Sequence, residues 1–132
     1  MKTVKCRISE VSLKNNETLL INIEAEKEFN VEDFIELTNA AEELGNGRRF
    51  YNLINVGALT LPNKEARELS CSLEGSAYKK ADAFVINSLP QKIMANVMLK
   101  INRPTVPTKF FSQIDEAEKW LQSLRINEHF AV

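Results

Sequence analysis

Residues 50–87 read FYNLINVGALTLPNKEARELSCSLEGSAYKKADAFVIN, and this stretch decides the fold class. Phe50–Val56 and Ala83–Ile86 are short apolar runs, which are typical of strands covered on both faces. Between them, Asn63 can cap a helix that runs toward Ala77. A strand, a helix and a second strand in this order form a right-handed crossover. The stretch therefore predicts two parallel strands of one sheet.

The residues before this stretch predict a hairpin and a helix. Apolar and polar residues alternate on both sides of Asn15–Asn16 between Val4 and Glu24, which is typical of two half-buried strands joined by a turn. The alternation slips near Ser9–Glu10, where a bulge would account for it. Asn30 can then cap a helix that ends at Gly45-Asn46-Gly47.

The residues after the stretch predict two more helices and one more strand. Ser88 and Gln91 have capping-box spacing at the start of a helix, Pro90–Ile101, that ends before Pro104. Thr108–Phe111 predicts the last strand, and a final helix follows it. We expect one α/β domain over residues 1–126, with an N-terminal β-hairpin, βα repeats, a mixed but mostly parallel sheet and about four helices. Residues 127–132 show no periodicity and are expected to form a C-terminal tail.

Composition narrows the class of protein. The chain has 132 residues, with 17 Lys and Arg against 18 Asp and Glu, so the basic balance of a nucleic-acid-binding protein is missing. No apolar run approaches the roughly 20 residues that span a bilayer, so membrane contact is expected to be at most peripheral. Cys6 and Cys71 stand far apart without a CxxC or Cys/His cluster, which argues against a metal site. Without a secretory signal, a cytoplasmic protein with reduced thiols is expected.

No catalytic residue or cofactor is predicted. The single histidine, His129, lies near the C-terminus, where solvated side chains are common. The motifs GxSxG, GxGxxG, HExxH and the P-loop do not occur. The carboxylate pairs Glu42–Glu43 and Glu116–Glu118 fall on predicted exposed helical turns. The protein is therefore expected not to be an enzyme.

Two surfaces are candidates for binding. The first is the crevice at the carboxyl ends of the parallel strands, where ligands collect in open α/β sheets. Its predicted residues are uncharged hydrogen-bonding groups, and helix capping alone could explain two of them: Asn55, Thr60, Asn63, Asn87 and Ser88.

The second surface is the helix Pro90–Ile101, whose apolar arc is wider than one sheet face requires. Its polar stripe is narrow, with Lys92, Asn96 and Lys100 at intervals of four. The surplus apolar side chains could pack on the final helix around Trp120, on a second copy of the chain, or on an apolar ligand or lipid. The ligand or partner surface predicted here consists of Lys92, Ile93, Met94, Val97, Met98, Lys100, Ile101 and Arg103.

Six local segments carry a resemblance to a known family. They are ELGNGRRF (43–50), KEAREL (64–69), ADAFVINS (81–88), NRP (102–104), VPTKFF (106–111) and EAEKWL (116–121). In these segments and in the order of its elements the sequence resembles small bacterial proteins described as STAS/SEC14-like, which have the SpoIIAA-like fold. The resemblance implies a non-enzymatic regulatory domain that acts through protein–protein contacts. Its SEC14-like part implies, as an alternative, a domain that binds a small apolar ligand or lipid.

The resemblance also raises a third function, that of a phosphorylation-gated antagonist. In the regulatory branch of the family a Ser or Thr near the loop after the third strand is phosphorylated by a partner kinase, and the added charge breaks a complex. Thr60 is the only hydroxyl-bearing residue in the corresponding loop, residues 55–63. The usual Asp-x-Ser-x-hydrophobic signature is absent from this loop, which weakens the case for Thr60.

Overall fold

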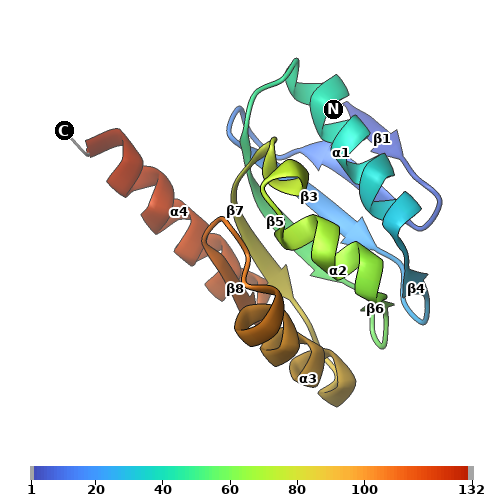
Figure 1. The fold of residues 1–132 in the computed structure, drawn as a ribbon. Coiled ribbons are helices and arrows are strands. Elements are labelled where there is room, and N and C mark those ends of the chain that lie inside the picture. Colours follow the sequence, from blue (N-terminus) through green and yellow to red (C-terminus); the bar gives the residue numbers. More distant parts are fainter. Residues whose placement is uncertain (1, 131–132) are drawn as a thin grey trace.

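Six strands form one mixed sheet in the computed structural model, which describes residues 2–130 (Figure 1). The strands are β1 (Thr3–Lys5), β2 (Ser9–Leu13), β3 (Thr18–Ile23), β5 (Phe50–Val56), β7 (Lys79–Val85) and β8 (Thr108–Phe111). They lie in the order β1-β2-β3-β5-β7-β8, antiparallel from β1 to β3 and parallel from β3 to β8. Two short strands, β4 (Glu28–Phe29) and β6 (Leu61–Pro62), pair separately beyond the main sheet.

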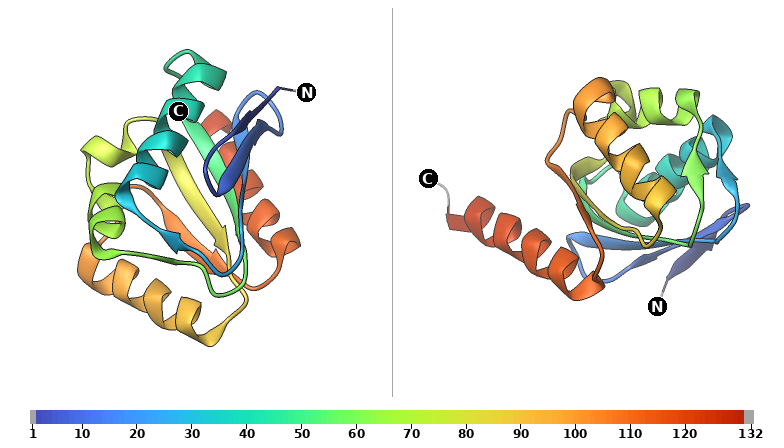
Figure 2. Two further views of the ribbon diagram at one scale, coloured as in Figure 1. Left: turned by 90° about the vertical axis from the view of Figure 1, so that its right-hand side faces the viewer. Right: turned by 90° about the horizontal axis from the view of Figure 1, so that it is seen from below.

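Helices cover both faces of the sheet. They are α1 (Val31–Gly45), α2 (Lys64–Cys71), the short 3-10 helix η1 (Glu74–Ser76), α3 (Leu89–Val97) with its π-helical extension η2 (Met98–Asn102), and α4 (Ile114–Phe130). Each successive parallel strand is added on the same side of the previous one, so the right-handed crossovers bring α1, α2 and α3 to one face. Figure 2 shows these three helices together and α4 on the other face.

Side-chain caps fix the starts of α1 and α2 as predicted. Asn30 Oδ1 accepts a hydrogen bond from Asp33 N at 3.1 Å, and Asp33 Oδ2 accepts one from Asn30 N at 2.9 Å. Asn63 Oδ1 accepts from Ala66 N at 2.9 Å. The expected capping box of α3 is wrong, because the hydroxyl of Ser88 has no hydrogen-bond partner and caps nothing.

The expected N-terminal hairpin is present as β2 and β3, but its first strand is shorter than predicted. The slip in the alternation is a chain reversal at Cys6–Ile8 and not a bulge, with Cys6 N donating to Ser9 O at 2.8 Å. The reversal adds β1 as a further antiparallel edge strand.

The expected tail is wrong for residues 127–130, which continue α4. Glu128 accepts hydrogen bonds from the Tyr51 hydroxyl and from Lys80 Nζ, and His129 Nε2 lies 2.8 Å from Glu17 Oε1. These contacts explain why the helix persists beyond its apolar stripe. Residues 131 and 132 lie outside the described residues.

The inner side of α4 packs on the sheet through Ala117 and Leu121, and Trp120 lies against Phe111 with ring centroids 5.8 Å apart. This arrangement excludes one of the three alternatives, that the apolar surplus of residues 90–101 packs around Trp120. The helix α3 lies on the opposite face of the sheet from α4, so its surplus apolar side chains cannot pack on α4 (Figures 1 and 2).

An ion pair between the N-terminal reversal and α1 gives the fold a defined pH dependence. Arg7 Nε and Nη2 donate to the buried Asp33 carboxylate at 2.8 and 2.6 Å. Burial alone would raise the pKa of Asp33, but the hydrogen bonds from Arg7 and from Asn30 N outweigh it and hold the pKa below its usual value.

The free energy of unfolding is therefore expected to fall as the pH drops from about 5 toward 2. A carboxyl whose pKa is depressed on folding contributes stability above its unfolded pKa, and that stability is lost as the pH falls through the folded pKa. Urea unfolding across this pH range measures the slope. In Arg7→Met the slope should be shallower than in the wild type, and equal slopes would contradict a role for this ion pair.

Candidate ligand-binding site

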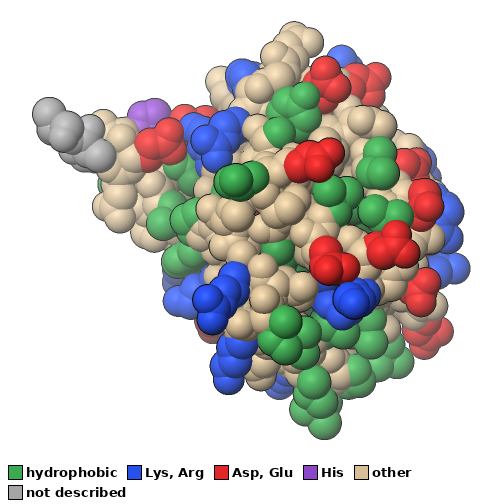
Figure 3. Space-filling view, viewed as in Figure 1, with side chains coloured by type: hydrophobic (Ala, Val, Ile, Leu, Met, Phe, Trp, Pro, Cys, Tyr) green, Lys and Arg blue, Asp and Glu red, His purple; other side chains and the backbone are tan. Residues whose placement is uncertain are grey.

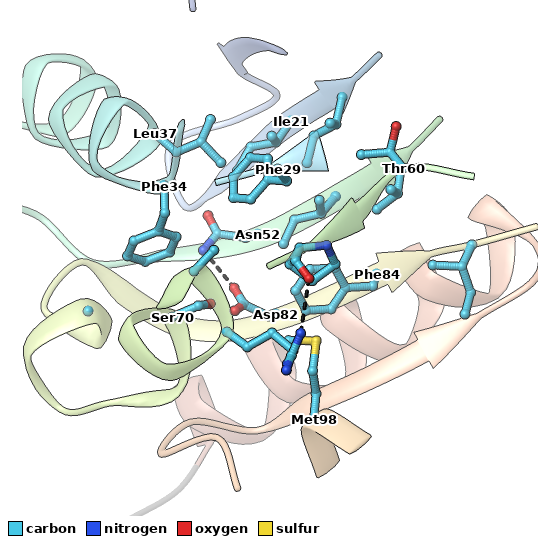
Figure 4. A pocket seen from close by; sticks show the side chains of 18 of the residues that line it. Ile21, Phe29, Phe34, Leu37, Asn52, Thr60, Ser70, Asp82, Phe84 and Met98 are labelled. Carbon is cyan, nitrogen blue, oxygen red and sulfur yellow. Dashed lines mark hydrogen bonds between the residues drawn. The ribbon is translucent and has the colours of Figure 1, made fainter. Parts of the chain in front are cut away.

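A cavity of about 120 Å³ lies between the sheet and the layer formed by α1, α2 and α3. Its walls are mostly aliphatic and aromatic side chains, which come from the main sheet, from β4 and from α1, α3 and η2: Ile21, Phe29, Phe34, Leu37, Ile54, Val56, Phe84, Met94, Met98 and Phe110. Figure 4 shows several of these side chains converging on one space. The rings of Phe84 and Phe110 stack on one another along the sheet side, with centroids 4.8 Å apart.

Short side chains on the helices account for the space. Ala41 from α1, Ala66 from α2 and Ala95 from α3 are all buried and all line the cavity. Protein interiors are normally packed as densely as organic crystals, so a space of this size needs a cause. An alanine on each of three helices leaves the volume that larger side chains would otherwise fill.

One end of the cavity is polar. Asn52 on β5 and Asp82 on β7 are register partners of adjacent parallel strands, so their side chains lie together. Asn52 Nδ2 donates to Asp82 Oδ1 at 2.9 Å, and Lys79 Nζ forms an ion pair with Asp82 Oδ2 at 2.8 Å. All three residues are at most 8% exposed. We call Asn52, Lys79 and Asp82 the polar cluster, and Figure 4 shows the hydrogen bond between Asn52 and Asp82.

The charges of the polar cluster are matched within it. Besides its bond to Asp82, Lys79 Nζ donates to Ser70 O at 2.8 Å and to Ser70 Oγ at 3.1 Å, which occupies its three protons. The ammonium also lies 5.3 Å from the centroid of the Phe34 ring, within cation–π range. The pair is thus accommodated inside an apolar surrounding.

Gln91 and Thr60 bound the cavity near the carboxyl ends of the strands. Gln91 Nε2 donates to Gly57 O at 2.8 Å and to Thr60 O at 3.1 Å, and Gln91 Oε1 accepts from Asn87 N at 3.0 Å. The Thr60 hydroxyl donates to Glu24 O and accepts from Lys27 N, and the residue is 2% exposed. A kinase could reach this hydroxyl only after the loop opened, which argues against phosphorylation of Thr60.

The residues predicted for the crevice do not form one site. Asn55 belongs to the opposite face of β5 and is exposed, with Nδ2 3.4 Å from Asn22 Oδ1. Asn63 is a helix cap, and Asn87 is exposed. Thr60 is the one member of the predicted set that lines the cavity.

Sequence reasoning missed Asn52 and Asp82. A signal for Asn52 was present, because it shares the period-two face of β5 with Ile54 and Val56, both of which face the cavity. Asp82 stood out as the single charge inside the apolar run Ala81–Ile86. The sequence does not show that the two residues are neighbours, because this follows only from the register of β5 and β7.

The residues predicted on the helix Pro90–Ile101 divide between two sides of α3 and η2. Met94 and Met98 line the cavity, and Val97 is half-buried. Ile93 and Ile101 are 58% and 73% exposed, and Leu89 joins them at 69%. The outward side also carries Lys92, Lys100 and Arg103, all exposed. Figure 3 shows hydrophobic side chains along the lower edge of the molecule, over α3, with Lys and Arg side chains beside them.

Residues 2–130 contain neither a metal-binding cluster nor a membrane-spanning helix. No group of three or more His, Cys, Asp or Glu side chains there is placed to share a metal ion. In the same residues, no helix combines the length and apolar character that crossing a membrane requires. Cys6 and Cys71 are free, and burial raises the pKa of both thiols.

Comparison with known proteins identifies the fold and the family. The structure is similar to the crystal structure of an uncharacterized protein of the DUF3478 family with a SpoIIAA-like fold from Shewanella loihica, with a TM-score of 0.59 and 18% identity. The match covers 86% of this chain and 91% of that one, which confirms the predicted SpoIIAA-like fold. No curated protein matches the sequence. The family described as Domain of unknown function (DUF7793) matches residues 11–125, and the chain belongs to that family.

Proposed function

We propose that this protein is a non-enzymatic binding domain that takes one compact, mostly apolar molecule into the cavity between its sheet and α1–α3. The observation that carries the proposal is an apolar cavity of about 120 Å³ closed at one end by the polar cluster. Binding sites typically combine apolar walls with a few placed polar groups in this way. Lys79 and Asp82 neutralise each other, so neither is free to act as nucleophile or base.

The volume limits the ligand to a small one. Pockets for drug-sized molecules are about 300–1,000 Å³, whereas an engineered apolar cavity of roughly 150 Å³ binds benzene. A cavity of about 120 Å³ therefore suits a single ring or a short chain. A lipid would need α3 to move outward, and the flexible Met94 and Met98 would be the side chains that adapt.

A bound molecule could be reported to a partner through α3. The inner side of this helix touches the cavity at Met94 and Ala95, and its outer side exposes Ile93. A ligand could bind the protein more tightly when α3 is in one position than when it is in another. Binding would then shift the population toward that position, and the outer surface of α3 would move with it. Such coupling gives the ligand-binding domain a regulatory role of the kind implied by the resemblance.

Toluene tests the cavity directly. At 100 times its Kd, toluene should stabilise the wild type by about 2.7 kcal/mol, seen as a rise in the melting temperature. Ala41→Leu fills part of the cavity, so toluene affinity should fall by about tenfold or more while the fold is kept. Ala77→Leu adds the same side chain at an exposed position and should leave toluene binding unchanged.

If neither toluene nor its hydroxylated analogue phenol raises the melting temperature of the wild type, the cavity is not a ligand site. Met98→Asp would be a poor substitute for these variants. Met98 is 6% exposed, so the carboxylate would be buried without a partner and would unfold the protein whatever the function.

A second function, peripheral contact with an anionic membrane, is favoured by the outer side of α3 and η2. Leu89, Ile93 and Ile101 are exposed there, and residues 83–114 contain four Lys or Arg and no Asp or Glu. Protein interfaces are depleted in Lys and enriched in aromatic residues, whereas aliphatic side chains flanked by Lys are typical of interfacial helices. The like charges also oppose pairing with a second copy through this side.

Co-sedimentation with vesicles tests this contact. The wild type should sediment with phosphatidylcholine–phosphatidylglycerol vesicles at low salt and not with pure phosphatidylcholine, because each basic side chain gains about 1 kcal/mol near an anionic surface. Ile93→Glu combined with Ile101→Glu should abolish sedimentation. Ile35→Glu, on α1 and 46% exposed, is the matched control and should retain it. If the wild type stays in solution, the membrane function is rejected and an acidic protein partner becomes the better occupant.

A further inference from the structure

The side-chain amide of Asn52 has only one reasonable orientation. A carboxylate accepts hydrogen bonds and donates none, and Lys79 Nζ lies 2.8 Å from Asp82 Oδ2 in an ion pair. The nitrogen of Asn52 must therefore face Asp82 Oδ1, at 2.9 Å, and the oxygen must face away from it. Figure 4 shows the oxygen turned toward the part of the cavity where Phe29 and Leu37 lie.

Asn52 Nδ2 makes the bond to Asp82, and Oδ1 accepts no hydrogen bond from any of the described residues. The residue is only 6% exposed, and the neighbouring walls are apolar. The atom is open to the cavity, so a molecule inside the cavity can donate to it, and an acceptor among such apolar walls is costly to leave without a donor. Thr38 also lines the cavity but does not supply the donor, because its hydroxyl donates to Phe34 O at 3.2 Å.

The surrounding charges limit what the donor can be. A carboxylate or phosphate would meet the Asp82 carboxylate and the Asn52 oxygen, which both repel it. An ammonium group on the ligand would be repelled by the ammonium of Lys79, which stays in place because its three protons are bound to Ser70 and Asp82. A neutral O–H or N–H group avoids both conflicts. Arg67, on the α2 side of the cavity, has a buried Nε without an acceptor. It could donate a hydrogen bond to an acceptor atom elsewhere on the same ligand.

We propose that the ligand is a small, otherwise apolar molecule carrying a neutral O–H or N–H group that donates to Asn52 Oδ1, as a phenol, an alcohol or an indole could. The inference rests on the proposed ligand-binding function and specifies the chemistry of the ligand. It also gives Asn52 the role of the residue that selects hydroxylated molecules over hydrocarbons.

Phenol and toluene form the decisive pair of probes, because they have nearly the same shape and differ by a hydroxyl and a methyl group. Phenol should bind the wild type about tenfold more tightly than toluene in calorimetric titrations. In a cavity without an available acceptor the order would be reversed, because burying an unpaired hydroxyl is unfavourable. Phenol should also shift the NMR signals of the Asn52 side-chain amide further than toluene does, because only phenol donates a hydrogen bond to Oδ1.

Asn52→Leu removes the acceptor and should make toluene the tighter ligand. Thr38→Val is the matched control, since Thr38 also lines the cavity but has its hydroxyl occupied, and the phenol preference should persist. If the leucine variant does not fold, the wild-type affinities and the amide signals still decide. Toluene binding as tightly as phenol, or a phenol preference kept in Asn52→Leu, overturns the inference and leaves the cavity function standing. If neither probe binds, the proposed function fails as well.

Discussion

Replacing Lys79 with methionine is expected to lower the free energy of unfolding by about 3–5 kcal/mol. The Lys79–Asp82 pair is buried, with side chains 10% and 4% exposed, and its atoms lie 2.8 Å apart. Methionine has nearly the shape of the lysine stem but leaves the Asp82 carboxylate inside the protein with only the amide of Asn52 as a donor. An uncompensated buried charge is among the few causes of so large a loss.

Two further variants separate the cost of an unpaired charge from the value of the pair. Lys79→Met combined with Asp82→Leu removes both charges and should recover most of the lost stability, because buried pairs are often replaceable by apolar residues. Lys14→Met breaks the Lys14–Glu118 pair, whose side chains are 38% and 40% exposed, and should cost less than about 1 kcal/mol. Urea unfolding measures all three. Equal losses in Lys79→Met and Lys14→Met would mean that Asp82 is solvated and that the polar cluster is not closed to water.

The outcome also bears on the cavity. If the double variant folds and still binds toluene, the ion pair supports the polar end without being needed for an apolar ligand. Its phenol preference should then be weakened, because Asp82 no longer holds the Asn52 amide in its orientation. The ion pair would thus act on the ligand through Asn52, as a positioning group.

Local signals predicted the fold well because they act over a few residues. Asn30 with Asp33, and Asn63 with Ala66, form the caps that their spacing indicates. The strand β1 was missed because the reversal at Cys6–Ile8 contains neither glycine nor proline. Arg7 in that reversal bonds to Asp33, 26 positions away, and no local pattern shows such a contact.

The site was harder to predict because it depends on register and on the direction of side chains. Asn55 is predicted as a crevice residue because it lies at the end of a strand. Asn52 is instead the residue on the face of β5 that meets the cavity under α1, α2 and α3. The alanines that leave the cavity open, such as Ala41 and Ala66, look like ordinary helix formers in the sequence. The unusual apolar width of residues 90–101 belongs to a helix that lines the cavity on one side and exposes apolar side chains on the other.

Gly75→Ala is expected to destabilise the protein by about 3 kcal/mol or more, because the added methyl group would meet backbone atoms. A Cβ at this position would lie 1.9 Å from the Leu69 carbonyl oxygen and 3.2 Å from a ring carbon of Phe34. The oxygen belongs to the last turn of α2, so η1 and α2 would have to separate. Gly75 and Phe34 also line the cavity, and this separation should weaken toluene binding together with stability.

Gly47→Ala is the control that distinguishes crowding from backbone strain. Gly47 has a φ of +84°, and nothing lies within 4 Å of the position of an added Cβ. Alanine there should cost only about 1–2 kcal/mol for the left-handed conformation and should leave toluene affinity unchanged. Thermal unfolding with and without toluene compares the two variants. A small loss for Gly75→Ala with normal toluene binding would mean that η1 is free to move away from α2, and the cavity wall on that side would then be adaptable.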